Sequence, residues 1–185
     1  MVLEFLADGF EEIEALTPID TLRRAGVDVK SVAVGKGGDK VVMGAHGIAV
    51  LADITEDEAF LIDKNEIDMI ILPGGMPGAK NLDESDFVDG FVNWAAKSCI
   101  YVASICAAPM IPGKRGLLSG RRAVCYPGFE EYLTGATVTD SKVETDGKYI
   151  TACGMGAALE FSLEIIKLLK GEVAAEHIRS SVFAK

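Results

Sequence analysis

The sequence is short of cysteine and histidine, and it carries little positive charge. Four cysteines among 185 residues are too few for a secreted disulfide scaffold, so we expect a reducing, cytoplasmic setting. With two histidines and no Cys-x-x-Cys pair, we expect no metal site. A net charge of -10 disfavours nucleic acid and anionic membranes as partners, because binding phosphate requires a basic face.

Long apolar runs are also missing. No stretch approaches the roughly 20 residues that a membrane-spanning helix needs, and the chain does not open on the basic region expected of a signal peptide. Hydrophobic residues make up 49% of the chain, charged residues 25% and aromatic residues 7%. That balance excludes disorder, collagen and coiled coil. We therefore expect one domain covering residues 1–185.

What the sequence does contain is an alternation of short apolar runs with helical patterns. Continuous apolar runs such as residues 70–72 are typical of strands covered by helices on both faces. The alternation predicts an α/β fold, a three-layer sandwich around a mostly parallel sheet. We predict main strands at Val2–Leu6, 28–34, Met69–Leu72 and 100–103, and shorter ones at Val41–Met43, 48–51, 142–144 and Tyr149–Ala152.

Three segments carry clear helix signals. Thr17 and Pro18 are typical of the first residues of a helix that Gly26 would end. Apolar residues recur along one stripe in residues 85–97 and again in residues 157–170. In sheets of this kind the functional site lies at the carboxyl ends of the strands, so the residues that follow each strand are the candidates.

Cys106 follows the strand predicted at 100–103. A nucleophile on a sharp strand-to-helix turn needs small residues two positions away on either side, and Ser104 and Ala108 are small. If a helix begins directly after Cys106, its N–H groups and its dipole would favour the thiolate. The alternative is that Cys106 is a small buried apolar residue at a strand end.

Gly74 and Gly75 follow the strand Met69–Leu72. Paired glycines in this place can present free backbone N–H groups to an oxyanion. The alternative is a plain tight turn.

Three glutamates, Glu11, Glu12 and Glu14, follow the strand Val2–Leu6. Most such groups form a solvated start of a helix. One of the three could instead be drawn towards the sheet end, where desolvation would raise its pKa and it could hydrogen-bond a thiolate. Their positions alone do not say which one.

Four motifs occur in order along the chain: Asp8-Gly9-Phe10-Glu11-Glu12-Ile13-Glu14, Leu72-Pro73-Gly74-Gly75, Ser104-Ile105-Cys106-Ala107-Ala108-Pro109 and Cys125-Tyr126-Pro127-Gly128-Phe129-Glu130. Together they resemble the ThiJ/PfpI family, and most of all its branch containing the Parkinson's-disease-associated protein deglycase. The resemblance covers essentially the whole chain, including Gly154-Met155-Gly156 followed by a helix.

The resemblance implies a flavodoxin-like fold, as in class I glutamine amidotransferases, and a homodimer. It implies that Cys106 is the reactive thiol and that Glu14 is the carboxyl that shares its proton. The backbone N–H groups of Gly75 and Ala107 would face that thiol. Activities known in the family include cofactor-free conversion of methylglyoxal to lactate, removal of glycation adducts, peptidase action, chaperoning and peroxide sensing.

Two departures from the family pattern narrow this range. Peptidase-like members have a histidine directly after the nucleophile, where this chain has Ala107. Without that base, peptidase activity is disfavoured. Tyr126 stands where the deglycase branch usually has a histidine. A tyrosine can hydrogen-bond a substrate oxygen, but its pKa of about 10 makes it a poor base.

His46 lies in a loop that the resemblance brings towards the mouth of the site. It would contact a substrate carbonyl or anion there, or remain a surface residue.

We therefore expect a cysteine-dependent, cofactor-free enzyme of glyoxalase or deglycase type, acting on a small aldehyde or ketoaldehyde. Cys106 would attack the carbonyl, the N–H groups of Gly75 and Ala107 would stabilise the oxyanion, and Glu14 would move the proton. The alternative is a non-enzymatic redox sensor or chaperone for oxidative stress, in which Cys106 is oxidised to a sulfinate held by Glu14. The same residues serve both hypotheses.

Overall fold

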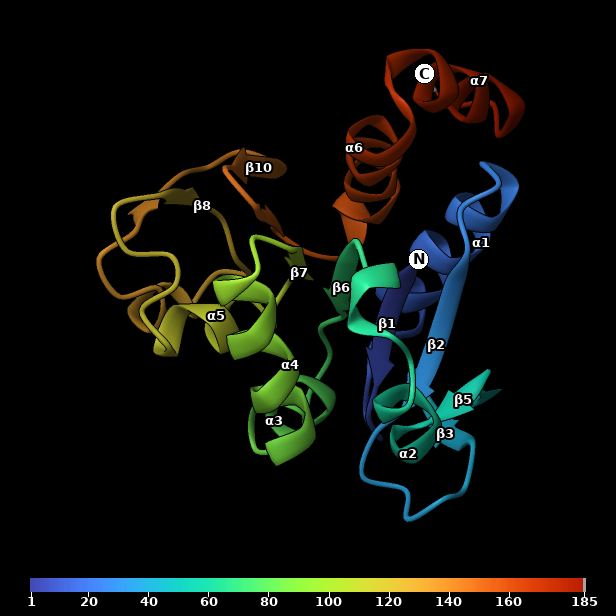
Figure 1. The fold of residues 1–185 in the computed structure, drawn as a ribbon. Helices are drawn as coiled ribbons and strands as arrows, with labels where there is room; N and C mark the ends of the chain where they lie inside the picture. The colour runs from blue at the N-terminus through green and yellow to red at the C-terminus, as the bar shows by residue number, and fades with distance from the viewer. Residues whose placement is uncertain (185) are drawn as a thin grey trace.

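The protein is built around a seven-stranded sheet. In the computed structural model, which describes residues 1–184, the strands are β1 Val2–Leu6, β2 Val29–Ala33, β5 Ile54–Thr55, β6 Met69–Leu72, β7 Tyr101–Ile105, β10 Val143–Asp146 and β11 Tyr149–Ala152. Their order is β10-β11-β7-β6-β1-β2-β5 (Figure 1). All neighbours run parallel except β10 and β11. The predicted mostly parallel sheet is confirmed.

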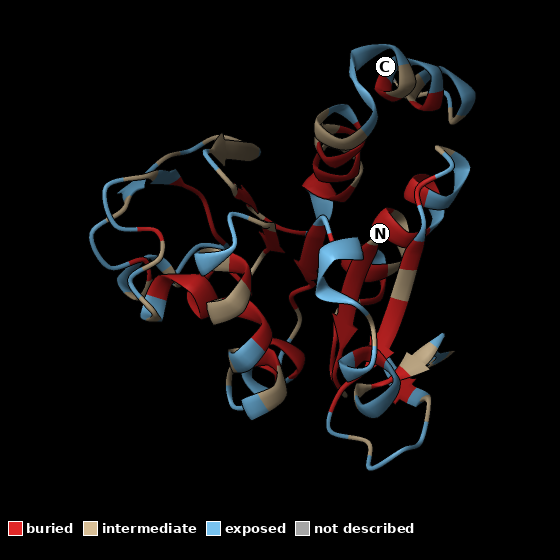
Figure 2. Cartoon of the chain, in the orientation of Figure 1, coloured by how far each residue is buried: buried red, intermediate tan, exposed pale blue. Residues whose placement is uncertain are grey.

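Helices cover both faces of this sheet, and its strands are buried between them (Figure 2). Successive residues of a strand point to opposite faces, so Phe5 joins one apolar cluster and Val2 the other. The three-layer sandwich is therefore confirmed. One layer is formed by α1 Glu12–Arg24, α6 Ala158–Lys170 and α7 Glu172–Ser181, and the other by α2 Glu56–Phe60, α3 Gly78–Asp83, α4 Asp86–Lys97 and α5 Met110–Lys114.

The chain reverses its course through the sheet at β1. From β1 it proceeds to β2 and β5 on one side, and then returns to β6 and β7 on the other. Segments that leave neighbouring strands in opposite directions leave room for a ligand at the carboxyl ends, the usual position in flavodoxin-like folds. The residues that follow β1, β6 and β7 meet at this edge.

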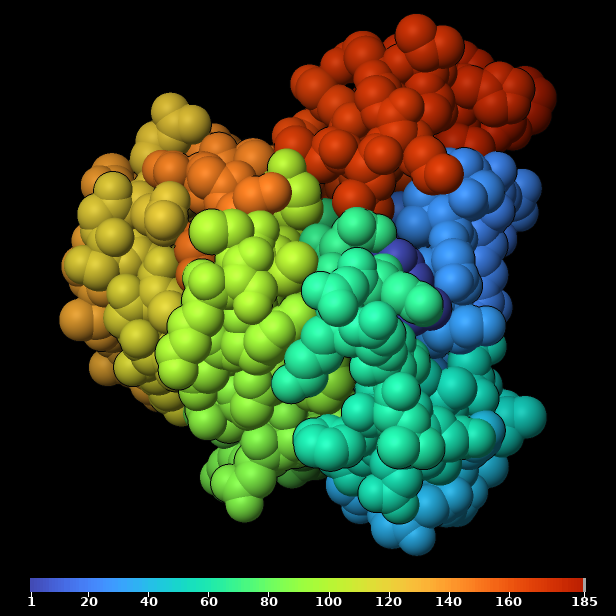
Figure 3. Space-filling view, in the orientation of Figure 1, coloured from blue at the N-terminus to red at the C-terminus, as the bar shows by residue number. Residues whose placement is uncertain are grey.

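The end of the chain returns to its beginning. Helix α6 packs against α1, and the space-filling view shows the red carboxyl-terminal segment beside the blue amino-terminal one (Figure 3). Shorter elements complete the fold: β3 Val41–Met43 with β4 Ala49–Leu51, β8 Arg122–Ala123 with β9 Thr137–Val138, and the single turns η1 Lys64–Glu66, η2 Glu130–Tyr132 and η3 Met155–Ala157.

None of the helices formed by residues 1–184 combines the length and the apolar character needed to traverse a bilayer.

The first helix begins earlier than the sequence predicts. A start at Thr17 and Pro18 is wrong, because α1 begins at Glu12 and Pro18 lies inside it. Glu11 is the residue that caps the helix, since its carboxylate accepts the N–H of Glu14 at 2.8 Å. Shorter side chains usually fill that position. The additional first turn is the part of α1 that carries Glu14.

Two boundaries near Cys106 also differ from the prediction. Strand β7 continues beyond residue 103 to Ile105, because Ser104 and Ile105 stay in register with β11. A run of turns then separates Cys106 from α5, which begins at Met110. A helix beginning directly after Cys106 is therefore wrong.

Glu4 of β1 is an ionisable residue in the core. It is fully buried, and neither of its carboxylate oxygens has a hydrogen-bond partner among residues 1–184. Burial raises the pKa of Glu4 well above its ordinary value, and the charge of Arg23 opposes this only in part. The folded protein therefore holds Glu4 protonated at pH values where the unfolded chain ionises it.

We expect Glu4→Leu to raise the free energy of unfolding by about 1–3 kcal/mol near pH 7, because an unpaired buried carboxyl is removed. The folded pKa lies above the unfolded one, so the wild-type carboxyl is least costly at low pH. Its cost grows by up to about 1.4 kcal/mol per pH unit above an unfolded pKa of about 4.3. Denaturant titrations at several pH values measure this.

Glu4→Gln is the matched control, because it keeps a polar head that does not titrate. The difference in unfolding free energy between this variant and the wild type should widen as pH rises. A difference that stays constant with pH would contradict the raised pKa.

Candidate functional site

Cys106 lies at the carboxyl end of β7 on a strained turn. Its φ is 64°, a left-handed conformation that residues with a Cβ rarely adopt. Its N–H donates to the carbonyl of Ala152 at 2.9 Å, and its own carbonyl accepts the N–H of Tyr126 at 2.8 Å. Strain of this kind persists where the surroundings enforce it, and here two separate segments hold the backbone of Cys106.

Glu14 faces the thiol from the first turn of α1. Its carboxyl hydrogen-bonds the Cys106 thiol and accepts the N–H of Met155, and its Oε2 accepts the N–H of Gly74 at 3.1 Å. A Cβ on Gly74 would lie 2.6 Å from the Cβ of Cys106. Only glycine at this position leaves room for carboxyl and thiol to meet.

Carboxyl and thiol form a buried acidic pair. Burial, with a contribution from the charge of Glu11, raises the pKa of Glu14 to about 7. Burial, together with the charge and the hydrogen bond of Glu14, raises the pKa of Cys106 to about 12. The pair therefore loses its first proton at about pH 7 and keeps the second, on the Cys106 sulfur beside the Glu14 carboxylate, far above neutrality.

Two backbone N–H groups point at the sulfur. Those of Gly75 and Ala107 hydrogen-bond the Cys106 thiol and act to lower its pKa. Gly75 has a φ of 88°, and a Cβ there would clash with the backbone of the loop after β1, so the turn requires glycine. The N–H of Gly74, which we grouped with them, is instead bound by Glu14.

Tyr126 lies beside the thiol and is 50% exposed. A Cβ on Gly154 would lie 3.3 Å from the Tyr126 ring and 3.9 Å from the Cys106 sulfur, so ring and sulfur flank the same glycine. The phenol thus borders the open side of the site, where a substrate oxygen could meet it.

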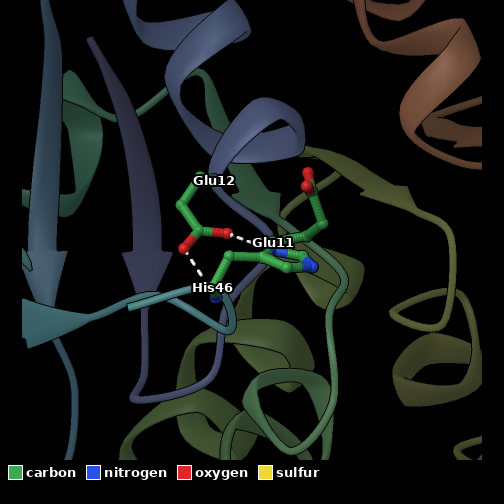
Figure 4. Close-up of side chains that lie close together, drawn as sticks. All are labelled: Glu11, Glu12 and His46. Carbon is green, nitrogen blue, oxygen red and sulfur yellow. Dashed lines mark hydrogen bonds and ion pairs between the residues drawn. The ribbon is translucent and has the colours of Figure 1, made fainter. Parts of the chain in front are cut away.

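His46 is bound to Glu12 at the start of α1 (Figure 4). Its Nδ1 lies 2.8 Å from Oε2 of Glu12, and its backbone N–H donates to Oε1 at 2.8 Å. The hydrogen bond and the charge of Glu12 raise the pKa of His46. The imidazole is 70% exposed. The structure therefore places His46 at the margin of the site, paired with a carboxylate.

Glu11, Glu12 and His46 form the group most similar to a metal site within residues 1–184. Their ligand atoms lie within 4.8 Å of one another (Figure 4). Each carboxylate already has a partner, because Glu12 binds His46 and Glu11 caps α1. A metal ion would have to displace these hydrogen bonds, so we assign none to the group.

Sequence reasoning missed the role of Met155 at the site. Its N–H, from η3, binds the Glu14 carboxyl together with that of Gly74. The available signal was the motif Gly154-Met155-Gly156, since it follows β11 at the same edge of the sheet as Cys106.

Comparison with known proteins gives a consistent result. Residues 1–168 match the family model described as DJ-1/PfpI family. A DJ-1 homolog B of Arabidopsis thaliana is 37% identical over 96% of this chain, which spans 40% of that protein's length. A deglycase of Pyrococcus abyssi is 33% identical over 91% of this chain and 99% of its own.

Solved structures agree with the sequence matches. DJ-1beta of Drosophila melanogaster has a TM-score of 0.92 at 30% identity, covering 100% of this chain and 97% of that one. Oxidised DJ-1 of Toxoplasma gondii has a TM-score of 0.90 at 33% identity, covering 98% and 97%. The flavodoxin-like fold expected from the sequence is confirmed.

We expect Glu14→Gln to lower the pH at which alkylation of Cys106 by iodoacetamide accelerates, because burial, with the help of the charge and the hydrogen bond of Glu14, raises the pKa of Cys106 to about 12 in the wild type. The rate of the variant at a pH of about 8.5 should exceed the wild-type rate at least about tenfold, since a pKa lower by one unit gives about ten times more thiolate. Peptide mass spectrometry follows the adduct at Cys106. Glu12→Gln is the matched control, and we expect it to keep the wild-type profile.

A Glu14→Gln variant alkylated no faster than the wild type would contradict the effect of Glu14 on the thiol.

Proposed function

The chain belongs to the DJ-1/PfpI family, and from this premise we propose that it is a cysteine-dependent, cofactor-free enzyme of glyoxalase or deglycase type acting on small reactive carbonyls. The observation that carries the proposal is the Glu14–Cys106 pair, which holds one mobile proton beside a nucleophile. The deglycase of Pyrococcus abyssi is a relative whose name includes such an activity.

The first step is addition to an aldehyde such as that of methylglyoxal. The Cys106 sulfur bonds to the aldehyde carbon, and the carbonyl electrons move onto oxygen. The N–H groups of Gly75 and Ala107, which converge on the sulfur, stabilise this oxyanion as it forms. Glu14 then gives it the shared proton, and the product is a hemithioacetal.

The second step moves a proton between neighbouring carbons. Glu14, now a carboxylate, takes the proton from the carbon bonded to sulfur and returns it to the former ketone carbon. A hydroxyl proton passes between the two oxygens, and the hemithioacetal becomes a thioester of lactate. Water hydrolyses the thioester, which releases lactate and restores the thiol. These steps need no external oxidant or reductant.

Other residues limit the chemistry rather than perform it. Ala107 supplies no base beside the thiol, so the leaving group of an amide would receive no proton, and peptidase action is disfavoured. Tyr126 is proposed to hydrogen-bond a substrate oxygen. His46, held by Glu12, is proposed only as a contact for the outer carbonyl or carboxylate of a substrate.

The test is methylglyoxal consumption with lactate detection. We expect Cys106→Ser to abolish turnover and Glu14→Gln to lower it by at least about 100-fold, the usual range for a lost acid–base group. Cys99→Ser is the matched control, since Cys99 is exposed and precedes β7 at the opposite end from Cys106. Wild-type turnover no higher than that of Cys106→Ser would contradict the proposed carbonyl chemistry. Full turnover in Glu14→Gln would contradict the proposed role of Glu14 in moving the proton.

A second function, that of a redox sensor or chaperone, is favoured by the donors around the sulfur. Glu14 in its protonated form and the N–H groups of Gly75 and Ala107 suit the oxygens of a sulfinate. Two peroxide molecules would each transfer one oxygen atom to Cys106 and leave as water. Among relatives, DJ-1 of Toxoplasma gondii has been solved in an oxidised form.

Intact mass and peptide mapping after mild peroxide test this second function. A gain of two oxygens confined to Cys106, without methylglyoxal turnover, is the expected signature of a sensor. Oxidation spread over the methionines, with Cys106 unchanged, would contradict it.

We also propose a homodimer formed through α1 and η3–α6. Ile13 and Met155, on either side of Glu14, are 49% and 54% exposed. Beside them lies a hollow lined in part by Leu16, Leu159 and Val182. Exposed apolar surface of this kind usually marks a protein–protein contact. Sedimentation velocity measures the oligomer directly.

A further inference from the structure

A groove lies between α3, α5 and η2, and the chemistry above does not use it. It has a volume of about 340 Å³, and its lining includes Met76, Met110, Phe129 and Tyr132. These side chains come from three separate segments of the chain, so the groove exists only in the folded protein.

The groove adjoins the two segments that frame the thiol. Met76 directly follows Gly75, whose N–H points at the sulfur. Phe129 lies just beyond Tyr126, which binds the Cys106 carbonyl through its N–H. Two parts of the groove lining therefore lie within three residues of a backbone N–H that contacts Cys106.

The lining combines charged residues with an apolar, polarisable part formed by Met76, Met110, Phe129 and Tyr132. Met76 is 50% exposed, and Met110 is buried. The rings of Phe129 and Tyr132 are tilted by 49° with centroids 5.9 Å apart. Thioether and aromatic side chains together bind flat aromatic groups well, through sulfur–aromatic and ring–ring contacts.

The charges at the rim are already paired. Lys114 lies 2.6 Å from Asp83 and 4.9 Å above the centroid of the Tyr132 ring, and Lys80 lies 3.8 Å from Glu84. No excess of either sign is left to recognise an ionic group. The hollow between β10 and the helices α6 and α7 has a larger share of charged residues in its lining.

We propose that this groove is the substrate-specificity subsite, and that it holds an aryl substituent on the ketone carbon of a 2-oxoaldehyde. The proposal rests on the proposed function, because the thiol must add to the neighbouring aldehyde carbon. It names the substrate class as aromatic ketoaldehydes, of which phenylglyoxal is the simplest. Methylglyoxal leaves the groove empty.

The test uses two alkylating ketones that differ only in this substituent, phenacyl bromide and bromoacetone. In both reactions a sulfur–carbon bond forms and a carbon–bromine bond breaks, with loss of bromide. Neither reaction requires turnover. The measured quantity is the rate with phenacyl bromide divided by the rate with bromoacetone at Cys106, followed by peptide mass spectrometry. The same ratio for glutathione is the reference.

We expect this ratio to exceed that of glutathione by at least about tenfold, the usual discrimination of an apolar pocket. Phe129→Ala should lower it to within about threefold of glutathione, because the aromatic wall is lost. Met76→Glu should do the same by adding a charge at an exposed position that the fold tolerates. Phe183→Ala is the matched control, since Phe183 is 92% exposed and lies outside the groove.

Two results would overturn the subsite. One is a wild-type ratio equal to that of glutathione. The other is a ratio that both groove variants leave unchanged, which includes variants in which the two rates fall by the same factor. Turnover of phenylglyoxal and methylglyoxal is then compared separately. High aryl selectivity in alkylation without turnover of either compound would contradict the proposed function but support the subsite.

Discussion

One proton held between the Glu14 carboxyl and the Cys106 sulfur is the interaction on which this edge of the sheet depends. Neither group could be buried alone without a large cost, since each would lose its hydration. Buried separately, each acid would have to keep its own proton, whereas the pair is stable with one proton between the two groups. The surroundings supply what remains: N–H groups from Gly74 and Met155 for the carboxyl, and from Gly75 and Ala107 for the sulfur.

A second buried glutamate, Glu4, lacks such partners, and the comparison shows what they contribute. Glu4 and Glu14 both have a pKa raised by burial. Hydrogen bonds from the Cys106 thiol and two backbone N–H groups oppose that rise at Glu14, and its pKa is about 7. Glu4 has no hydrogen-bond partner among the described residues. A glutamate side chain therefore takes part in the proposed chemistry at Glu14 and only lowers stability at Glu4, because the neighbouring groups differ.

Sequence reasoning reached the architecture because apolar runs of strands covered on both faces are a strong local signal. It failed at the start of α1, where Thr17 and Pro18 mimic a helix start and Glu11 is an unusual cap. Spacing alone could not choose among Glu11, Glu12 and Glu14, and only the family resemblance selected Glu14. The pairing of His46 with Glu12 joins residues 34 positions apart, and no local pattern reports such a contact.

The hydrogen bonds that hold Cys106 have a consequence for the order in which the protein is made. A ribosome releases the chain from its amino end, and the carbonyl of Ala152, which accepts the Cys106 N–H, emerges well after Cys106 itself. Met155, which binds Glu14, emerges later still. Until then the nascent chain carries an unstrained cysteine with no shared proton. Reactivity at this thiol is therefore acquired only after the segment through Met155 has emerged.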